Sequence, residues 1–125
     1  MRLLTILLCF ALLLGGCSVA EGSPMAEYRR ISSEEAKAMM DTADVIILDV
    51  RTQEEFDAGH IEGAILIPYS EIAQRAQELD KTATILIYCR SGRRSEIAAR
   101  VLVDMGYPAV YDFGGILDWP YGVIS

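Results

Sequence analysis

The stretch TILIYCRSGRRS, residues 84–95, decides the fold of this 125-residue chain. Its opening segment, residues 84–88, is a short apolar run of the kind found in buried parallel strands, and Cys89 follows it directly. Residues 95–105 then show the apolar spacing of an amphipathic helix. We expect the buried face of this helix to consist of Ile97, Ala98, Val101, Leu102 and Met105. A cysteine therefore stands where a buried strand ends and a helix begins.

The rest of the chain alternates between strand and helix patterns. Short apolar runs typical of strands occur at 28–31, 45–48, 64–67 and 109–111. Helix patterns with a serine or threonine before an acidic first turn occur at 33–41, 54–58 and 71–79, with Ser32, Thr52 and Ser70 as the N-caps. This alternation predicts one α/β domain with a mainly parallel central sheet flanked by helices. Ligands of such sheets bind at the carboxyl ends of the strands, where Cys89 and Asp49 fall.

The N-terminal segment has the order of a signal peptide rather than of a domain helix. Met1 and Arg2 precede an almost wholly apolar run, 3–14, which is shorter than the roughly 20 residues needed to span a bilayer. The following Leu-Gly-Gly-Cys, residues 14–17, resembles a bacterial lipobox, in which the cysteine is lipidated and becomes the first residue. We therefore expect a lipoprotein signal peptide at 1–16, a tether at 17–26 starting from lipidated Cys17, and the domain at 27–125. The protein would then be extracytoplasmic and anchored to a membrane by lipid, with the choice of membrane left open.

The net charge and the number of cysteines argue against two classes of function, nucleic-acid binding and zinc binding. The net charge of −7 argues against a nucleic-acid partner. Cys9 lies in the predicted signal peptide and Cys17 would be lipidated, so Cys89 remains as the one thiol of the mature chain. One cysteine and one histidine cannot supply a zinc site, and we expect no metal.

The residues after Cys89 are suited to an anionic substrate. Only a thiolate is nucleophilic, and a helix N-terminus together with nearby arginines favours that form. Backbone N–H groups curled around the sulfur would add an anion-stabilising nest. We predict Cys89 as the catalytic nucleophile, with substrate-binding residues Arg90, Ser91, Gly92, Arg93, Arg94 and Ser95. The alternative is a buried cysteine followed by a solvated basic turn.

Four motifs in the expected order resemble those of the single-domain rhodaneses. They are LDVR at 48–51; EEF at 54–56 with GHIEGA at 59–64 and Ile-Pro at 67–68; YCRSGRRS at 88–95; and Gly-Gly-Ile at 114–116 with Trp119. The resemblance implies a three-layer rhodanese-like sandwich without a cofactor. It also implies a persulfide on Cys89, formed from a donor such as thiosulfate and passed to cyanide or a thiol, including that of a thioredoxin-like protein.

Two other functions remain open at this point. Phosphatases and arsenate reductases resemble the rhodaneses in fold but have one residue more between cysteine and arginine. Here four residues separate Cys89 from Arg94, and the tighter loop favours a sulfane sulfur over a tetrahedral oxyanion. A non-catalytic module that docks an envelope partner is the third hypothesis.

Four residues outside the loop have either a functional or a structural interpretation. Asp49 either bonds the Cys89 loop or one of its arginines, or caps its own turn. We expect Arg51 to pair with a carboxylate such as Glu55 and to support the fold. His60 is interpreted as part of a structural turn rather than as a catalytic base, and Trp119 as a core residue.

Overall fold

The computed structural model describes residues 26–125, so the predicted signal peptide and the lipidation site Cys17 lie outside the described residues. Within this range the strands are β1 (Arg29–Arg30), β2 (Val45–Asp49), β3 (Ile65–Leu66), β4 (Thr84–Cys89) and β5 (Val110–Gly115). The α-helices are α1 (Ser33–Thr42), α2 (Gln53–Ala58), α3 (Ile72–Arg75) and α4 (Arg93–Asp104), and short 3-10 turns form η1 (Tyr69–Glu71), η2 (Ala76–Glu78) and η3 (Ile116–Asp118). No helix in this part of the chain is both long and apolar enough to cross a membrane.

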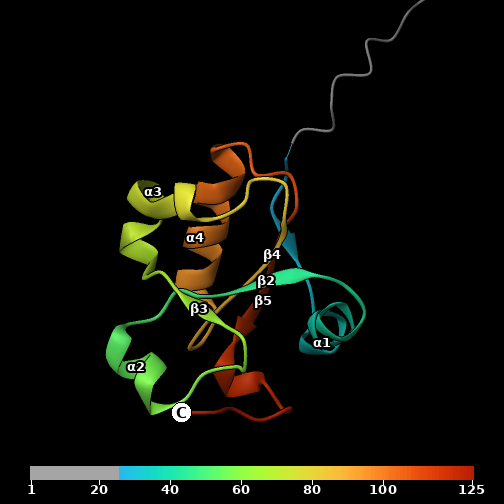
Figure 1. Ribbon diagram of the computed structural model, residues 1–125, viewed down its shortest axis with the longest axis vertical. Coiled ribbons are helices and arrows are strands. Elements are labelled where there is room, and N and C mark those ends of the chain that lie inside the picture. The colour runs from blue at the N-terminus through green and yellow to red at the C-terminus, as the bar shows by residue number, and fades with distance from the viewer. Residues whose placement is uncertain (1–25) are drawn as a thin grey trace, which may run out of the picture.

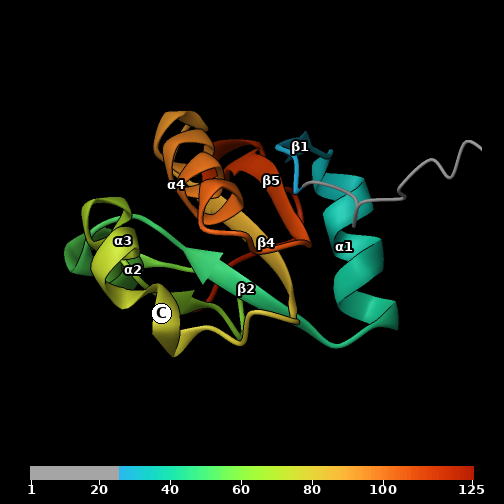
Figure 2. The ribbon, with the colours of Figure 1, turned by 90° about the horizontal axis from the view of Figure 1, so that it is seen from above.

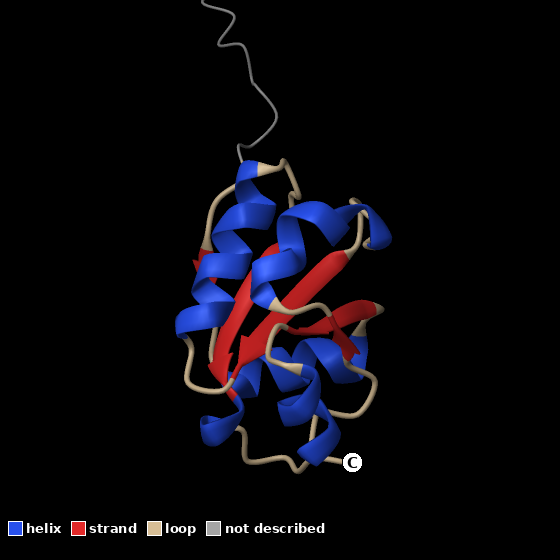
Figure 3. Cartoon of the chain, turned by 90° about the vertical axis from the view of Figure 1, so that its left-hand side faces the viewer, coloured by secondary structure: helices blue, strands red, loops and turns tan. Residues whose placement is uncertain are grey.

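The strands form one parallel sheet, in the order β1-β5-β4-β2-β3 (Figure 1). Helix α1 covers one face, and α3 and α4 cover the other, so that the sheet is the middle of three layers (Figures 2 and 3). The predicted three-layer α/β fold is confirmed. Because all strands run the same way, their carboxyl ends lie at one edge, where Asp49 is opposite Tyr88 and Cys89 is opposite Gly115.

Strand β4 at the centre of the sheet contributes to the core on both faces. Ile85, Ile87 and Cys89 belong to the cluster on the α3 and α4 side, whereas Leu86 and Tyr88 belong to the cluster on the α1 side. This alternation follows from the two-residue period of a strand. All five residues are buried, which explains why the segment reads as continuously apolar.

Helix α4 begins two residues earlier than predicted, and its buried face matches the predicted one at Ala98, Val101 and Leu102. Its buried residues are Ser95, Ala98, Ala99 and Leu102, whereas Ile97 and Met105 are each 40% exposed. The expected face was therefore wrong at those two positions. The start of the helix at Arg93 is set by the loop, and small residues at 95, 98 and 99 allow it to approach the sheet closely.

The single helix predicted over 71–79 is broken into η1, α3 and η2. The carbonyl of Ala76 accepts hydrogen bonds from the Tyr107 hydroxyl at 2.6 Å and from Leu79 N–H at 2.9 Å, which closes a 3-10 turn in place of an α-helical one. Ser70 lies inside η1, and no side-chain cap is formed there, so the predicted Ser70 cap was also wrong. The predicted caps at Ser32 and Thr52 are both present.

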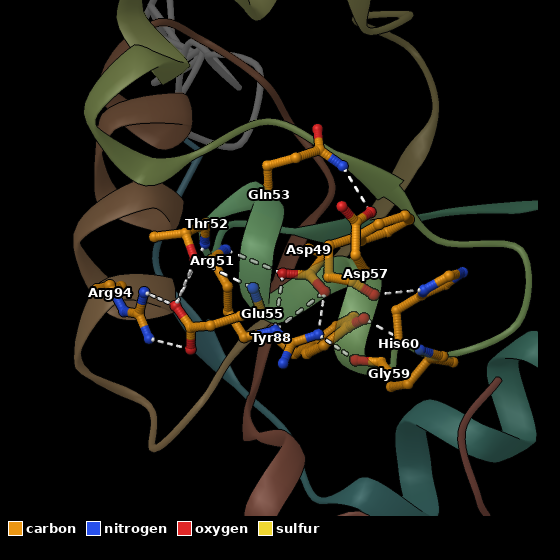
Figure 4. Close-up of polar contacts among 12 residues, drawn as sticks. Asp49, Arg51, Thr52, Gln53, Glu55, Asp57, Gly59, His60, Tyr88 and Arg94 are labelled. Atoms are coloured by element: carbon orange, nitrogen blue, oxygen red, sulfur yellow. Dashed lines mark hydrogen bonds and ion pairs between the residues drawn. The ribbon is translucent and has the colours of Figure 1, made fainter. Parts of the chain in front are cut away.

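A buried ion pair joins the end of β2 to the segment after α2 (Figure 4). The carboxylate of Asp49 accepts from Arg51 Nη2 at 2.7 Å and from the Arg51 backbone N–H at 2.9 Å, so Asp49 caps its own turn and contacts none of the loop arginines. Arg51 also donates to the Gly59 carbonyl at 2.7 Å. Arg51 pairs with a carboxylate as expected, but the partner is the nearer Asp49 and not Glu55, the example given.

This pair predicts a large effect of replacing Arg51 by methionine. Asp49 is fully buried and Arg51 only 5% exposed, so the Arg51→Met variant leaves an uncompensated carboxylate in the core. We expect a loss of about 3–5 kcal/mol in the free energy of unfolding, measured by urea denaturation. The Arg75→Met variant, which breaks only exposed ion pairs, should lose far less stability. Equal losses in the two variants would contradict this role.

Candidate active site

The thiol of Cys89 lies at the junction between the sheet and a helix N-terminus. Cys89 is the last residue of β4 and only 1% exposed. The backbone N–H of Gly92 donates to its Sγ at 2.9 Å, and the Oγ of Ser95 lies 3.5 Å from the same sulfur. The predicted nucleophile is therefore held by short-range contacts from its own loop.

The loop from Arg90 to Gly92 turns the chain directly into α4. Gly92 is the N-cap residue, with φ at +111°, in the left-handed region that favours glycine. The first turn of this 12-residue helix follows, so the positive end of its dipole lies beside the sulfur. A nest of several backbone N–H groups around the sulfur was predicted. Within residues 26–125, one such hydrogen bond is present, from the Gly92 N–H to Sγ.

Ser95 lies beneath the loop rather than at its surface. The side chain is fully buried, and its hydroxyl donates to the Gly92 carbonyl at 3.0 Å and lies 3.4 Å from the Gly114 carbonyl. Ser95 therefore links the loop to the end of β5. The structure places it as a support of the loop, whereas Ser91 is exposed on the outside.

The three arginines after Cys89 occupy different environments. Arg94 makes a two-pronged ion pair with Glu55 from α2, at 2.7 Å and 2.9 Å (Figure 4). The hydrogen bonds from Arg94 lower the pKa of Glu55 to about 2, and the same contact raises the pKa of Arg94. Arg90 and Arg93 are exposed, and neither has an ion pair within residues 26–125.

The backbone of β5 supports the loop from below. A Cβ atom at Gly115 would lie 2.2 Å from the Arg90 carbonyl oxygen, so a side chain there would displace backbone atoms. The N–H of Leu117 donates to that same carbonyl at 3.3 Å. Gly115 is thus required by the close approach of two backbone segments, whereas Gly114 has φ at +91° and faces the Arg30 side chain.

Two residues near the loop were missed by the sequence analysis. Glu55 was considered only as an example of a partner for Arg51, whereas its place in α2 brings it to Arg94. Arg30 comes from β1, and its guanidinium lies over the Gly92 and Gly114 backbones. Nothing in the sequence signals Arg30, because its contact depends on β1 joining the sheet beside β5.

A groove with a volume of about 460 Å³ opens beside the loop. Its walls combine the polar side chains of Arg51, Glu55 and Arg90 with apolar side chains that include Leu117 and Val123. Leu117 and Val123 are 63% and 52% exposed. The groove meets the Cys89 loop at Arg90, the one residue of the loop that lines it.

His60 and Trp119 have structural contacts. The ring of His60 stacks on Phe56 with centroids 3.7 Å apart, and its Nδ1 lies 2.8 Å from the Phe56 carbonyl. Trp119 packs against Phe113 and donates from its ring nitrogen to the Gly122 carbonyl at 3.0 Å. The position of His60 agrees with its structural interpretation, whereas Trp119 packs against the core but is only partly buried and also lines the groove. Within residues 26–125, no group of three or more potential ligand side chains lies close enough to hold a metal ion.

Comparisons with known proteins agree with this geometry. The family model of the rhodanese-like domain matches residues 32–120. YrkF of Bacillus subtilis, a candidate sulfur carrier protein, is 43% identical over 71% of this chain but only 49% of YrkF, so the chain spans about half of that relative. GlpE of Coxiella burnetii, a thiosulfate sulfurtransferase, is 32% identical over 74% of this chain and 87% of GlpE.

A solved structure supports the same conclusion. The crystal structure of a rhodanese-like domain protein from Staphylococcus aureus aligns with a TM-score of 0.69 and 33% identity, over 77% of this chain and 96% of that one. The range matched by the family model runs from α1 to η3 and includes the cysteine loop, whereas β1 with Arg30 lies just before it. By sequence, fold and loop, this chain belongs to the rhodanese-like domain family.

Proposed function

We propose that the protein is a sulfurtransferase that carries a sulfane sulfur on Cys89. The observation that carries the proposal is the position of Sγ, which accepts the Gly92 N–H at 2.9 Å beside the N-terminus of α4. Such a position stabilises negative charge on a sulfur atom, both before and after a further sulfur is attached. Relatives such as GlpE are named thiosulfate sulfurtransferases, and this supports thiosulfate as the donor.

The reaction has two displacement steps at sulfur. In the first, the Cys89 thiolate attacks the outer sulfur of thiosulfate. A sulfur–sulfur bond forms on Cys89, the sulfur–sulfur bond of thiosulfate breaks, and sulfite leaves with the electron pair. In the second, cyanide or a thiolate attacks the terminal sulfur, forming thiocyanate or a new persulfide and releasing the Cys89 thiolate. No net oxidant, metal or organic cofactor is required.

The three arginines after Cys89 have different roles in this proposal. Arg94 is occupied by Glu55, and this pair fixes α2 beside the start of α4. Arg90 and Arg93 are exposed and have no ion pair within residues 26–125, and this supports a role for them in binding the sulfonate oxygens of the donor. Because the chain as a whole carries a net charge of −7, this basic surface is a local exception that attracts anions to the thiol.

The acceptor reaches Cys89 through the groove next to Arg90. Its exposed apolar residues, Leu117 and Val123, suit a thiol carried on a partly apolar surface, as in a thioredoxin-like protein. A small acceptor such as cyanide needs none of these contacts. We further propose that Cys17 is lipidated and that the protein acts at an extracytoplasmic membrane surface. The support is the Leu-Gly-Gly-Cys sequence after a short apolar segment.

Replacing the thiol tests the chemistry. After incubation with thiosulfate, mass spectrometry of the native protein should show one added sulfur atom on Cys89, and cyanide should remove it as thiocyanate. The Cys89→Ser variant should form neither product, since its hydroxyl cannot accept the sulfur. Absence of the added sulfur and of thiocyanate in the native protein would contradict the proposal. Phosphate release from an aryl phosphate that depends on Cys89 would favour the phosphatase hypothesis instead.

The Glu55–Arg94 pair predicts a pH-dependent contribution to stability. Because hydrogen bonds from Arg94 lower the pKa of Glu55 from 4.5 to about 2, the folded state binds the Glu55 proton less readily than the unfolded state does. The contribution is therefore present above about pH 4.5 and lost as the pH falls towards about 2.

The Glu55→Gln variant measures this contribution. In urea denaturation it should be less stable than the native protein at neutral pH, and the difference should fade between those two pH values. Glu54→Gln, which removes a neighbouring charge with no ion pair to Arg94, is the matched control and should not show this fading difference. A Glu55→Gln difference that is constant with pH would show that the ion pair is not its cause.

Lipid anchoring is tested separately from activity. The native protein expressed with its N-terminal segment should fractionate with membranes, because several acyl chains at about 0.8 kcal/mol per buried CH₂ group hold it there. The Cys17→Ala variant should lose this association, whereas Cys9→Ala, a matched change within the signal segment, should retain it. Membrane association of Cys17→Ala equal to that of the native protein would refute the anchor.

A further inference from the structure

The guanidinium of Arg30, on the edge strand β1, lies beside both glycines that shape the Cys89 loop. A Cβ atom built at Gly114 would lie 2.8 Å from Arg30 Nη2, and one built at Gly92 would lie 3.7 Å from the same nitrogen. The guanidinium therefore occupies the space that a side chain at Gly114 would fill, and it lies within van der Waals distance of the position of a Cβ at Gly92. It spans the loop on one side and the end of β5 on the other.

The position of Arg30 is set by a buried carboxylate. In the parallel register, Arg30 lies opposite Asp112 on β5, and the two side chains approach to 3.8 Å. Asp112 is fully buried, accepts from the Tyr28 hydroxyl at 2.6 Å, and accepts from the Gly114 N–H at 2.9 Å. One carboxylate thus orients both the arginine and the glycine turn over which the arginine lies.

Both glycines have positive φ, which glycine adopts without steric strain. Gly92 has φ at +111° and Gly114 has φ at +91°, so neither segment has regular strand or helix geometry at that residue. The Gly92 segment also supplies the N–H that binds the Cys89 sulfur. The flat guanidinium of Arg30 packs across the segments at Gly92 and Gly114 and so restricts the distance between them. It thereby also restricts the distance from the Gly92 N–H to the Cys89 Sγ.

We propose that Arg30 is a positioning residue that clamps the Cys89 loop against β5 and so holds the Gly92 N–H on the sulfur. It acts through Gly92 and does not contact the reacting atoms. The consequence for sulfur transfer rests on the proposed function, whereas the clamp itself does not.

A clamp differs from a simple source of positive charge. The flat, forked guanidinium can pack across two backbone segments while it faces Asp112, whereas the compact ammonium of lysine retains only the charge. Arg30→Lys therefore separates the two roles, and Arg30→Met removes both. Arg29→Met is the matched control, because Arg29 belongs to the same strand but hydrogen-bonds Tyr111 and packs over its ring, away from the loop.

The primary readout is amide hydrogen exchange of Gly92 in the full domain, compared with the rate of Cys89 alkylation by the neutral reagent iodoacetamide. We expect Arg30→Met and Arg30→Lys both to speed Gly92 exchange by about tenfold, the scale of one lost interaction of this kind, and to alter the alkylation rate. Persulfide formation from thiosulfate should slow in the same two variants, mainly in kcat. Arg29→Met should match the native protein in all three measurements.

Two results would overturn the proposed role of Arg30. Native Gly92 exchange in Arg30→Met would overturn the clamp, and full recovery of the native values in Arg30→Lys would show that charge alone accounts for the effect. If Arg30→Met fails to fold, Arg30→Lys alone decides, by the same exchange measurement. If the native protein forms no persulfide, the proposed function fails while the exchange data still test the clamp.

Discussion

The site depends on one close contact between two backbone segments, the Cys89 loop and the end of β5. Gly115 is paired with Cys89 in the sheet, and the Arg90 carbonyl lies 2.2 Å from the position where a Cβ at 115 would begin. Any side chain at 115 would push the loop away from the sheet. The contact therefore fixes where the chain leaves β4, where α4 starts, and how the Gly92 N–H meets the sulfur.

Around this contact the charged side chains have separate tasks. The Asp49–Arg51 pair is buried and holds the turn after β2 to the segment after α2. The Glu55–Arg94 pair is partly exposed and joins α2 to α4. With Arg94 engaged, the N-terminus of α4 is the positive group beside the thiol, and Arg90 and Arg93 are exposed. The residues that support the loop are thus different from Arg90 and Arg93, which we propose as the anion-binding residues.

The sequence was sufficient for the features that depend on neighbouring residues. A buried strand running into Cys89 and then a helix, and the caps at Ser32 and Thr52, follow from local patterns that the structure reproduces. The sequence was not sufficient for features that depend on contacts between residues far apart in the chain. The Tyr107 hydroxyl breaks the expected helix at Ala76, and the position of Arg30 over the loop depends on the β1–β5 pairing. Such contacts carry no periodicity or spacing that could be recognised in advance.

The central claim is that the Gly92 N–H and the start of α4 hold a sulfur atom that accepts a second sulfur. The most direct test is a high-resolution crystal structure of the protein after treatment with thiosulfate. The account predicts extra density for one sulfur bonded to Cys89 Sγ, with the loop unchanged and the Gly92 N–H still directed at Sγ. An unmodified thiol, with thiosulfate absent or bound away from the loop, would contradict it.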